Sequence, residues 1–184
     1  MKALSLGIVL FAMTATMLVA EIPKGWWAAK TDDYTFGVET SDGKPAAYIQ
    51  SVTAAPKSFI GLNQTFNAEK FCGKRVRLKG DIKTQDVIKW AGFWLRGDDK
   101  NSKIVAFDNM QARGVSGSTN WTPGEIVLDI PGDAKTLYLG LLLDGAGKAW
   151  MRNLSFEVVD DSVPTTNVAK AVLPDQPVNL GFTE

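Results

Sequence analysis

The feature that most constrains this fold is a two-residue alternation in residues 74–83, KRVRLKGDIK. Every odd-numbered position of this segment carries a charged side chain, and the opposite face carries Val76, Leu78, Gly80 and Ile82. Successive side chains of a β-strand point to opposite faces of a sheet, so the pattern is typical of a strand with one buried and one solvated face. The segment is predicted as a strand in a sheet that is covered on one side only.

Further extended segments are separated by turn residues such as Pro131-Gly132 and Asp144-Gly145. Strands are expected over residues 46–52, 58–66, 91–96, 103–107, 125–130, 136–143 and 149–159. About eight short strands with turns between them predict an all-β fold, a two-sheet antiparallel jelly-roll sandwich. Its expected core consists of Val76, Leu78, Ile82, Phe93, Leu95, Ile126, Leu128, Leu154 and Phe156. No longer segment keeps a 3.6-residue apolar period, so the only helical element expected is a single turn over residues 67–71.

The two ends of the chain differ from its β-rich middle. Residues 3–20 form an uncharged apolar run, which is typical of a secretory signal peptide over residues 1–20. The run has 18 residues, the lower limit for a membrane span, so an uncleaved N-terminal anchor is the alternative. Residues 21–160 are expected to form the jelly-roll domain and residues 161–184 a flexible tail. The protein is thus predicted to be extracytoplasmic, either periplasmic or secreted.

Composition excludes several classes of function. The 20 Lys and Arg residues balance 20 Asp and Glu residues, so the chain has no basic excess and nucleic acid is not an expected partner. The absence of His excludes His-dependent nucleophile systems and imidazole zinc sites. The single cysteine, Cys72, excludes an intramolecular disulfide and a cysteine metal cluster, and it is expected to be buried beside Phe71.

The sequence also lacks a recognisable catalytic arrangement. Its aspartate pairs, at 32–33, 98–99 and 160–161, are adjacent residues. Neighbours in a strand point to opposite faces, and in a turn both point to water, so none of these pairs is a preorganised acid and base. The Ser-rich segment 114–118 has neither a following helix nor a base, so it is not a nucleophile elbow. The protein is expected not to be an enzyme and to need no cofactor or metal.

A binding site is predicted on one strand and on the loop after the next. Trp90, Trp94 and Arg96 lie at i, i+4 and i+6 and so share one face of an extended chain, and Asp108 and Asn109 follow the next strand. An indole on which a sugar ring stacks, beside a guanidinium that donates to its oxygens, suits a carbohydrate. Asp108 and Asn109 would add an acceptor and an amide. The alternative is that Trp94 belongs to the core and that Arg96 forms a structural ion pair with Asp108.

Several motifs together resemble a bacterial module of galactose-binding-like fold. Residues 66–78, FNAEKFCGKRVRL, are similar to its F-x-A-x-x-Y-x-G-K-R-V-R-L segment, and residues 90–96 to its W-A-G-L-W-M-R segment. Its A-F-D-N-M, V-L-D-I-P and G-L-L-L-x-G-x-G-x-x-W segments correspond to residues 106–110, 127–131 and 140–150. The resemblance spans residues 22–160. It implies a jelly roll of the kind found in many carbohydrate-binding modules.

Members of this family often have a regulator label, and this chain differs from many of them just after its last Trp. Members occur as small exported proteins and as appended domains that are often labelled AraC-type transcriptional regulators, although this sequence predicts no helix-turn-helix. Relatives often have acidic residues just after the last Trp, where this chain has Arg152. A cation at this place argues against a structural calcium ion.

The sequence is consistent with two functions. The first is a non-catalytic, exported module that binds a carbohydrate or another small cell-envelope ligand. The alternative is a structural or protein-interaction module of an envelope assembly. The Trp pair at 26–27 and Trp121 are expected to pack at edges and to anchor turns rather than to bind.

Overall fold

The computed structural model describes residues 21–167, 176, 180 and 181. The predicted signal peptide and most of the predicted tail lie outside these residues. The strands are β1 (Trp27–Ala28), β2 (Tyr34–Ser41), β3 (Lys44–Ser51), β4 (Ile60–Asn67), β5 (Lys74–Asp98), β6 (Ile104–Asp108), β7 (Val115–Ile130), β8 (Thr136–Asp144) and β9 (Lys148–Val159). Two 3-10 turns, η1 (Glu69–Phe71) and η2 (Gln111–Arg113), complete the described elements. Within this part of the chain, no helix is long and apolar enough to cross a membrane.

The longest strand, β5, joins two segments that the sequence predicts as separate strands, 74–83 and 91–96. Its 25 residues contain several register shifts between Ile82 and Ala91. At this bend Asp86 has a left-handed backbone, with a φ of 53°. The prediction of two strands was wrong because bulges bend an extended chain without ending it.

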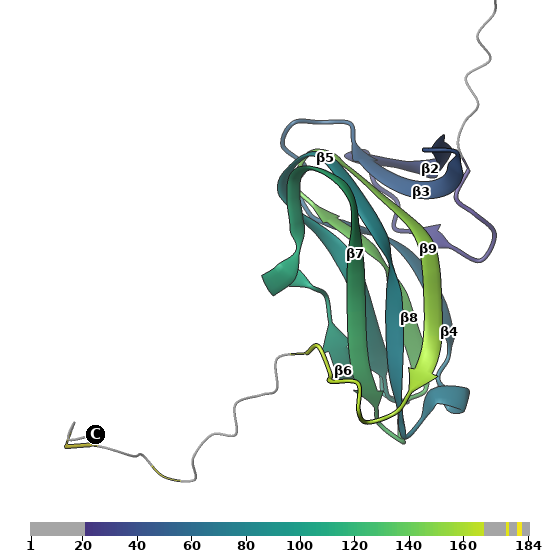
Figure 1. Cartoon of the computed structure of the whole chain (residues 1–184), viewed down its shortest axis with the longest axis vertical. Coiled ribbons are helices and arrows are strands. Elements are labelled where there is room, and N and C mark those ends of the chain that lie inside the picture. The colour runs from purple at the N-terminus through teal and green to yellow at the C-terminus, as the bar shows by residue number, and fades with distance from the viewer. Residues whose placement is uncertain (1–20, 168–175, 177–179, 182–184) are drawn as a thin grey trace, which may run out of the picture.

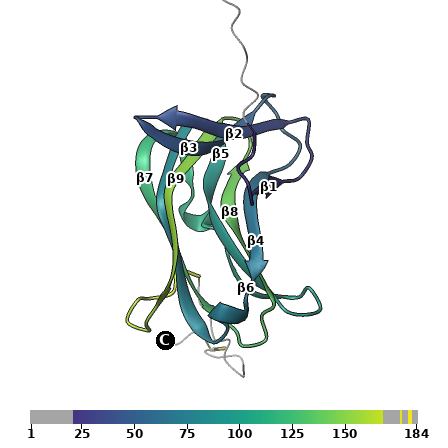
Figure 2. The ribbon, with the colours of Figure 1, turned by 90° about the vertical axis from the view of Figure 1, so that its right-hand side faces the viewer.

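Because β5 bends, it belongs to both layers of the sandwich. Its first half pairs with β7 and β9, and β9 leads on to β3 and β2. Its second half pairs with β8 and β6, and β8 leads on to β4 and β1. Figure 1 shows the first layer in front of β8 and β4, and Figure 2 shows the two layers from the side. The predicted two-sheet antiparallel jelly roll is confirmed.

The core lies between the two layers and follows the predicted inward faces. Seven of the nine predicted core residues are at most 1% exposed: Val76, Leu78, Ile82, Phe93, Leu95, Ile126 and Leu128. Leu154 and Phe156 are half-buried and pack against this core. The ring of Phe156 meets Phe66 and Phe71 edge-to-face, at centroid distances of 5.4 and 5.0 Å. These last residues therefore form the margin of the core rather than its centre.

Strand β2, which the sequence does not predict, forms a hairpin with β3 that crosses one end of the sandwich (Figure 2). Its Glu39 carboxylate accepts hydrogen bonds from Trp150 Nε1 at 2.7 Å and from Lys148 Nζ at 2.8 Å. Burial would raise the pKa of Glu39, but these two donors outweigh it and hold the pKa below its ordinary value. These hydrogen bonds attach the hairpin to β9, and the Trp150 indole N–H therefore has a structural role.

The chain after β9 differs from the predicted flexible tail over residues 161–167. Arg75 Nη1 donates to two carbonyl oxygens of this segment, at 3.0 and 2.9 Å. The Thr166 amide donates to the Val127 carbonyl at 2.9 Å, and the Thr166 hydroxyl accepts from the Val127 amide at 2.8 Å. Strand β7 pairs only with β5 in the described sheet, so its other edge offers backbone groups that this segment can satisfy.

Candidate binding groove

The second half of β5 presents the predicted binding residues on its outer face. Phe93 and Leu95 are fully buried on the inner face, so the two-residue period turns Trp94 and Arg96 outward, where both are half-buried. Trp90 lies on the same outer face and is also half-buried. The structure therefore brings Trp90, Trp94 and Arg96 together on one surface, as the spacing predicts, and places Trp94 outside the core.

These residues line a groove of about 530 Å³ on the outer face of β5, β8 and β4, which we call the aromatic groove. Five of its walls are aromatic rings: Trp27, Phe59, Trp90, Trp94 and Phe107. Three of these rings are exposed to solvent, Trp27 and Phe107 by 43% and Phe59 by 59%. Aromatic rings gathered at exposed positions around one hollow form a contiguous apolar surface, which is typical of a binding site.

Trp94 is held in place by neighbours on β4 and β8. Its Nε1 donates to Asn63 Oδ1 at 3.0 Å, and Asn63 is buried, with Nδ2 donating to the Gly61 carbonyl at 3.0 Å. The Tyr138 ring stacks against the indole, 6.3 Å away between centroids and inclined by 18°. The ring orientation is thus fixed by a hydrogen bond at one edge and by a stacked ring at its side.

Two glycines allow the close packing of backbone and side chains next to the aromatic groove. Gly140 is the register partner of both Trp94 and Asn63. A Cβ atom at Gly140 would overlap the Leu62 carbonyl oxygen and press on Asn63, and one at Gly92 would lie 3.1 Å from Met110 Cβ. Glycine at position 140 therefore permits the close approach of β4 that brings Asn63 beside Trp94, and glycine at position 92 leaves room for Met110.

Arg96 forms an ion pair, but with a different partner from the one considered in the sequence analysis. Its Nε and Nη2 donate to the two carboxylate oxygens of Asp98, at 2.6 and 2.7 Å, because residues i and i+2 of a strand share a face. Hydrogen bonding to Asp98 raises the pKa of Arg96 further above its ordinary value. The proposed pair between Arg96 and Asp108 was wrong.

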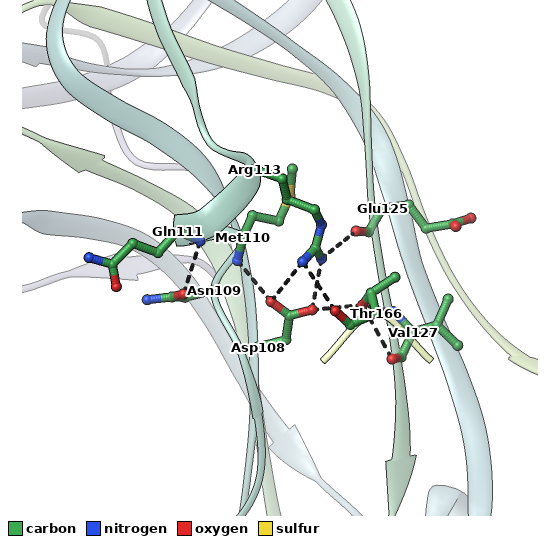
Figure 3. Close-up of polar contacts among 8 residues, drawn as sticks. All are labelled: Asp108, Asn109, Met110, Gln111, Arg113, Glu125, Val127 and Thr166. Carbon is green, nitrogen blue, oxygen red and sulfur yellow. Dashed lines mark hydrogen bonds and ion pairs between the residues drawn. The ribbon is translucent and has the colours of Figure 1, made fainter. Parts of the chain in front are cut away.

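Asp108 points away from the aromatic groove. It pairs in register with Leu95, whose side chain faces the core, and it is 8% exposed. Its carboxylate accepts from Arg113 Nη2 at 2.7 Å, from the Thr166 hydroxyl at 2.7 Å and from the Met110 amide at 2.9 Å (Figure 3). Burial would raise the pKa of Asp108, but these three donors outweigh it and lower the pKa. The structure therefore does not place Asp108 beside Trp94 and Arg96, because the strand period puts it on the opposite face.

Asn109, one residue further on, lines the aromatic groove together with Gln111. Its Oδ1 accepts from the backbone N–H of Gln111 at 3.0 Å (Figure 3). This hydrogen bond stabilises the loop that carries the Asn109 and Gln111 side chains. The left-handed backbone of Met110, with a φ of 57°, makes the tight turn that leads from Asn109 into η2. Four of the five predicted site residues thus meet in the groove.

Sequence reasoning missed several groove residues because they come from other strands. Trp27 belongs to the short edge strand β1, and its Nε1 donates to Thr65 Oγ1 at 2.9 Å. Phe107 is the register partner of Arg96 on β6, and Phe59 immediately precedes β4. Only the pairing of β4, β8, β5 and β6 brings these residues together, so no spacing along the sequence marks them.

Two charged side chains line the aromatic groove, Arg96 and Asp144. Asp144 Oδ1 pairs with Lys89 Nζ at 2.9 Å, and Arg96 pairs with Asp98. Among the residues that the structure describes, no group of three or more Cys, Asp or Glu side chains is arranged to hold a metal ion. The groove is therefore an apolar surface with neutral amides and two compensated charges.

A second, more open hollow of about 730 Å³ lies along β6, η2 and the segment ending at Asn167. Its polar lining includes Asp108, Arg113 and Thr166, which bond to one another. These groups serve the attachment of the C-terminal segment and leave the aromatic groove as the candidate site.

No protein-family model matches the chain. A Bacillus subtilis (strain 168) protein named as an uncharacterized HTH-type transcriptional regulator, YbfP, is 38% identical over 168 residues. The match covers 88% of this chain and 57% of that protein, so the chain spans little more than half of the relative's length. The residues described by the structure contain no α-helix and hence no helix-turn-helix.

Solved structures with a similar fold include binding modules and enzymes. The C-terminal family 22 carbohydrate-binding module of Clostridium thermocellum Xyn10B has a TM-score of 0.53 at 16% identity, over 73% of this chain and 86% of that one. The Stig cyclase Fisc from Fischerella sp. TAU, solved in complex with an indole derivative, has a TM-score of 0.54 at 15% identity, over 76% and 87%. At this identity the likeness concerns the fold alone. The chain has the jelly-roll architecture of carbohydrate-binding modules.

Proposed function

We propose that the protein is an exported, non-catalytic module that binds a carbohydrate in the aromatic groove. The observation that carries this proposal is the set of exposed rings, Trp27, Phe59 and Phe107, around the fixed indole of Trp94. Sugar rings present flat C–H faces that stack on aromatic side chains and hydroxyl groups that need hydrogen bonds. The amides of Asn109 and Gln111 supply donors and acceptors of that kind.

The comparisons support this proposal through the architecture. In the Clostridium thermocellum module, residues in the cleft have a role in ligand binding. The aromatic groove of this chain is likewise a hollow on one face of the sandwich. The cyclases of the same fold mean that architecture alone does not decide between binding and catalysis. The non-catalytic part of the proposal rests on the two charged groove residues, Arg96 and Asp144, since each is already in an ion pair.

Export is supported by the sequence. The apolar run of residues 3–20 after Met1-Lys2 has the form of a signal peptide, and extracellular or envelope polysaccharides would then be the accessible glycans. N-terminal sequencing of the native protein should find a start at or near Glu21. A retained Met1 in a cytosolic pool would contradict the export.

One observation favours a second function, that of a protein-interaction module. Among the described strands, β6 pairs with β5 only, and its Ile104 and Phe107 side chains are 48% and 43% exposed. An unpaired strand edge with apolar side chains can accept an extended segment of a partner protein. This function would use the backbone edge of β6, whereas carbohydrate binding uses the groove that Ile104 and Phe107 also line.

Both functions can be compared with two variants that each truncate an exposed apolar side chain to Ala. Phe107→Ala removes an exposed ring of the aromatic groove, and Val158→Ala removes an exposed apolar side chain from β9, outside the groove. Affinity electrophoresis through a panel of soluble polysaccharides should show retardation of the parent protein and of Val158→Ala. The loss of a stacking ring should weaken binding by Phe107→Ala about tenfold. A parent protein that no polysaccharide retards would contradict the carbohydrate proposal and leave the β6 edge as the better candidate.

A further inference from the structure

From the charges around the aromatic groove we infer that its ligand is an uncharged glycan, and that Asp98 is the residue that excludes acidic sugars. This inference rests on the proposed carbohydrate function and names the class of ligand. It depends on three features of the molecule: the ion pair that already compensates the charge of Arg96, the charges of the other groove residues and the burial of the Asp98 carboxylate.

Arg96 is the only cation among the groove residues that the structure describes, and its charge is already compensated. Both carboxylate oxygens of Asp98 accept from the guanidinium, at 2.6 and 2.7 Å. The guanidinium also lies over the Tyr138 ring, 5.6 Å from its centroid. A sugar carboxylate would have to compete with a bidentate partner that is built into the same strand.

Asp98 is fixed more firmly than an exposed counter-ion. Its side chain is 4% exposed, whereas that of Arg96 is 32% exposed. A buried carboxylate cannot turn to water when a ligand arrives, because leaving it unpaired would cost free energy. The ion pair therefore persists in the complex. The remaining N–H groups of Arg96 can still donate to hydroxyl oxygens.

The other charged residue of the groove, Asp144, is a carboxylate that pairs with Lys89 and offers no donor to an anion. Its partner Lys89 is 60% exposed, and an exposed pair of this kind is screened by solvent. An acidic sugar would thus meet a carboxylate at one end of the groove and a compensated guanidinium at the other. The formal charge of the whole chain is zero, so the chain has no net positive charge that would attract anions. Hydroxyl groups, by contrast, match the amides of Asn109 and Gln111.

The wild-type protein tests the inference directly. Its affinities for hexasaccharides of xylose, glucose and mannose and for an oligogalacturonate are measured by calorimetry at about 50 and about 500 mM NaCl. We expect at least one neutral hexasaccharide to bind tighter than the oligogalacturonate, with an affinity that changes less than about twofold with salt. Tighter binding of the oligogalacturonate, or a loss of about tenfold at high salt, would overturn the inference while leaving carbohydrate binding intact. Binding of neither class would overturn the proposed function as well.

A variant identifies Asp98 as the source of the exclusion. Asp98→Asn keeps the shape of the side chain and leaves Arg96 uncompensated, so binding of the oligogalacturonate should rise by about tenfold or more and become salt-dependent. Asp133→Asn, which removes the same charge from an exposed turn, should leave it unchanged. An Asp98→Asn protein that melts at the parent temperature yet gains no affinity for the acidic oligosaccharide would contradict the role of Asp98. If this variant does not fold, the comparison of ligand classes and salt in the wild type decides the inference.

Discussion

Single residues set the shape of the aromatic groove before any ligand arrives. The Trp94 ring is held at its edge by buried Asn63 and at its side by Tyr138, and it lies across from Gly140. A ring that is already oriented loses little conformational freedom on binding, which favours affinity without adding contacts. This arrangement also requires glycine at position 140, because a side chain there would collide with β4.

Gly140→Ala should therefore destabilise the protein. The added Cβ atom would overlap the Leu62 carbonyl oxygen, which belongs to the backbone of β4 and cannot turn away. Forcing β4 and β8 apart is expected to lower the free energy of unfolding by about 1–3 kcal/mol. Urea denaturation of the variant measures this change.

The matched control is Gly132→Ala, where a Cβ atom would meet no other atom within 4 Å. Its stability should equal or slightly exceed that of the parent, because Ala restricts the unfolded chain. Equal stability of the two variants would show that the close approach of β4 and β8 at Gly140 is not required.

At the residue scale, the sequence predicts faces better than partners. The positions of Trp94 and Arg96 on one outer face follow from the two-residue period and need no tertiary information. Asp98 shares the face of Arg96 by the same period, but Asp108 was the partner considered from the sequence, and only the register of β5 with β6 shows that Asp108 lies opposite Leu95 and faces the core. Trp27 and Phe59 could not be assigned to the site, since they reach it through β1 and β4.

At the scale of elements, the structure differs from the sequence prediction at two places that support the groove: the bend of β5 and the segment after β9. Strand β5 was predicted as two strands because its bend lies in a stretch without clear alternation, KTQDVIK, at residues 83–89. The docking of residues 161–167 on β7 could not be predicted, because this segment has no alternation and its hydrogen bonds to Val127 of β7 are made by the hydroxyl group and backbone of Thr166. This attachment also holds Asp108 and Arg113, which flank the loop that carries Asn109 and Gln111 (Figure 3).

Thr166→Val tests the attachment of this segment. The change keeps the volume of the side chain but removes the hydroxyl group that accepts from the Val127 amide and donates to Asp108. We expect the free energy of unfolding to fall by about 1–3 kcal/mol, since Val127 N–H loses its partner. Hydrogen exchange should become faster at the amides of Val127 and Met110, because the latter donates to the same aspartate.

Thr165→Val is the control, because the Thr165 side chain makes no hydrogen bond in the described part of the chain. It should leave both exchange rates and the stability unchanged. Exchange rates at Val127 and Met110 that are the same in Thr166→Val as in the parent would mean that the segment does not hold the loop.

At the scale of the whole molecule, the chain lacks side chains with an ordinary pKa near neutral pH. It contains no His, so no side chain has an ordinary pKa between about 5 and 8. Several carboxylates, among them Glu39, Asp108 and Asp129, have a pKa below the ordinary value. Because the folded pKa lies below the unfolded one, these groups stabilise the fold above about pH 4, and this stabilisation is lost as the pH falls through the folded values.

The free energy of unfolding should thus be flat between about pH 5 and 8 and should decrease below about pH 4. At the alkaline end, burial raises the pKa of Tyr34 to about 12, so its contribution is present below about pH 10 and is lost as the pH rises towards 12. Denaturant unfolding at a series of pH values measures this profile. A step between pH 5 and 8 would contradict it.

The function of this protein has to be inferred from its site rather than from its fold. Jelly rolls of similar architecture occur in carbohydrate-binding modules and in cyclases, so the prediction of the fold from strand periodicity could not by itself reach a ligand. What distinguishes this molecule is the placement of its tryptophans. Trp27, Trp90 and Trp94 line the aromatic groove, whereas Trp121 and Trp150 donate to Asp42 and Glu39 at the β2–β3 hairpin.

This division makes the indole N–H resonances the most direct test of the central claim. In a two-dimensional ¹⁵N–¹H spectrum, titration with the oligosaccharide that binds best should shift the signals of Trp27, Trp90 and Trp94. The signals of Trp121 and Trp150 should stay in place and serve as the internal control within the same sample. Shifts confined to Trp121 and Trp150, or a bound glycan that moves none of the three groove indoles, would contradict binding in the aromatic groove.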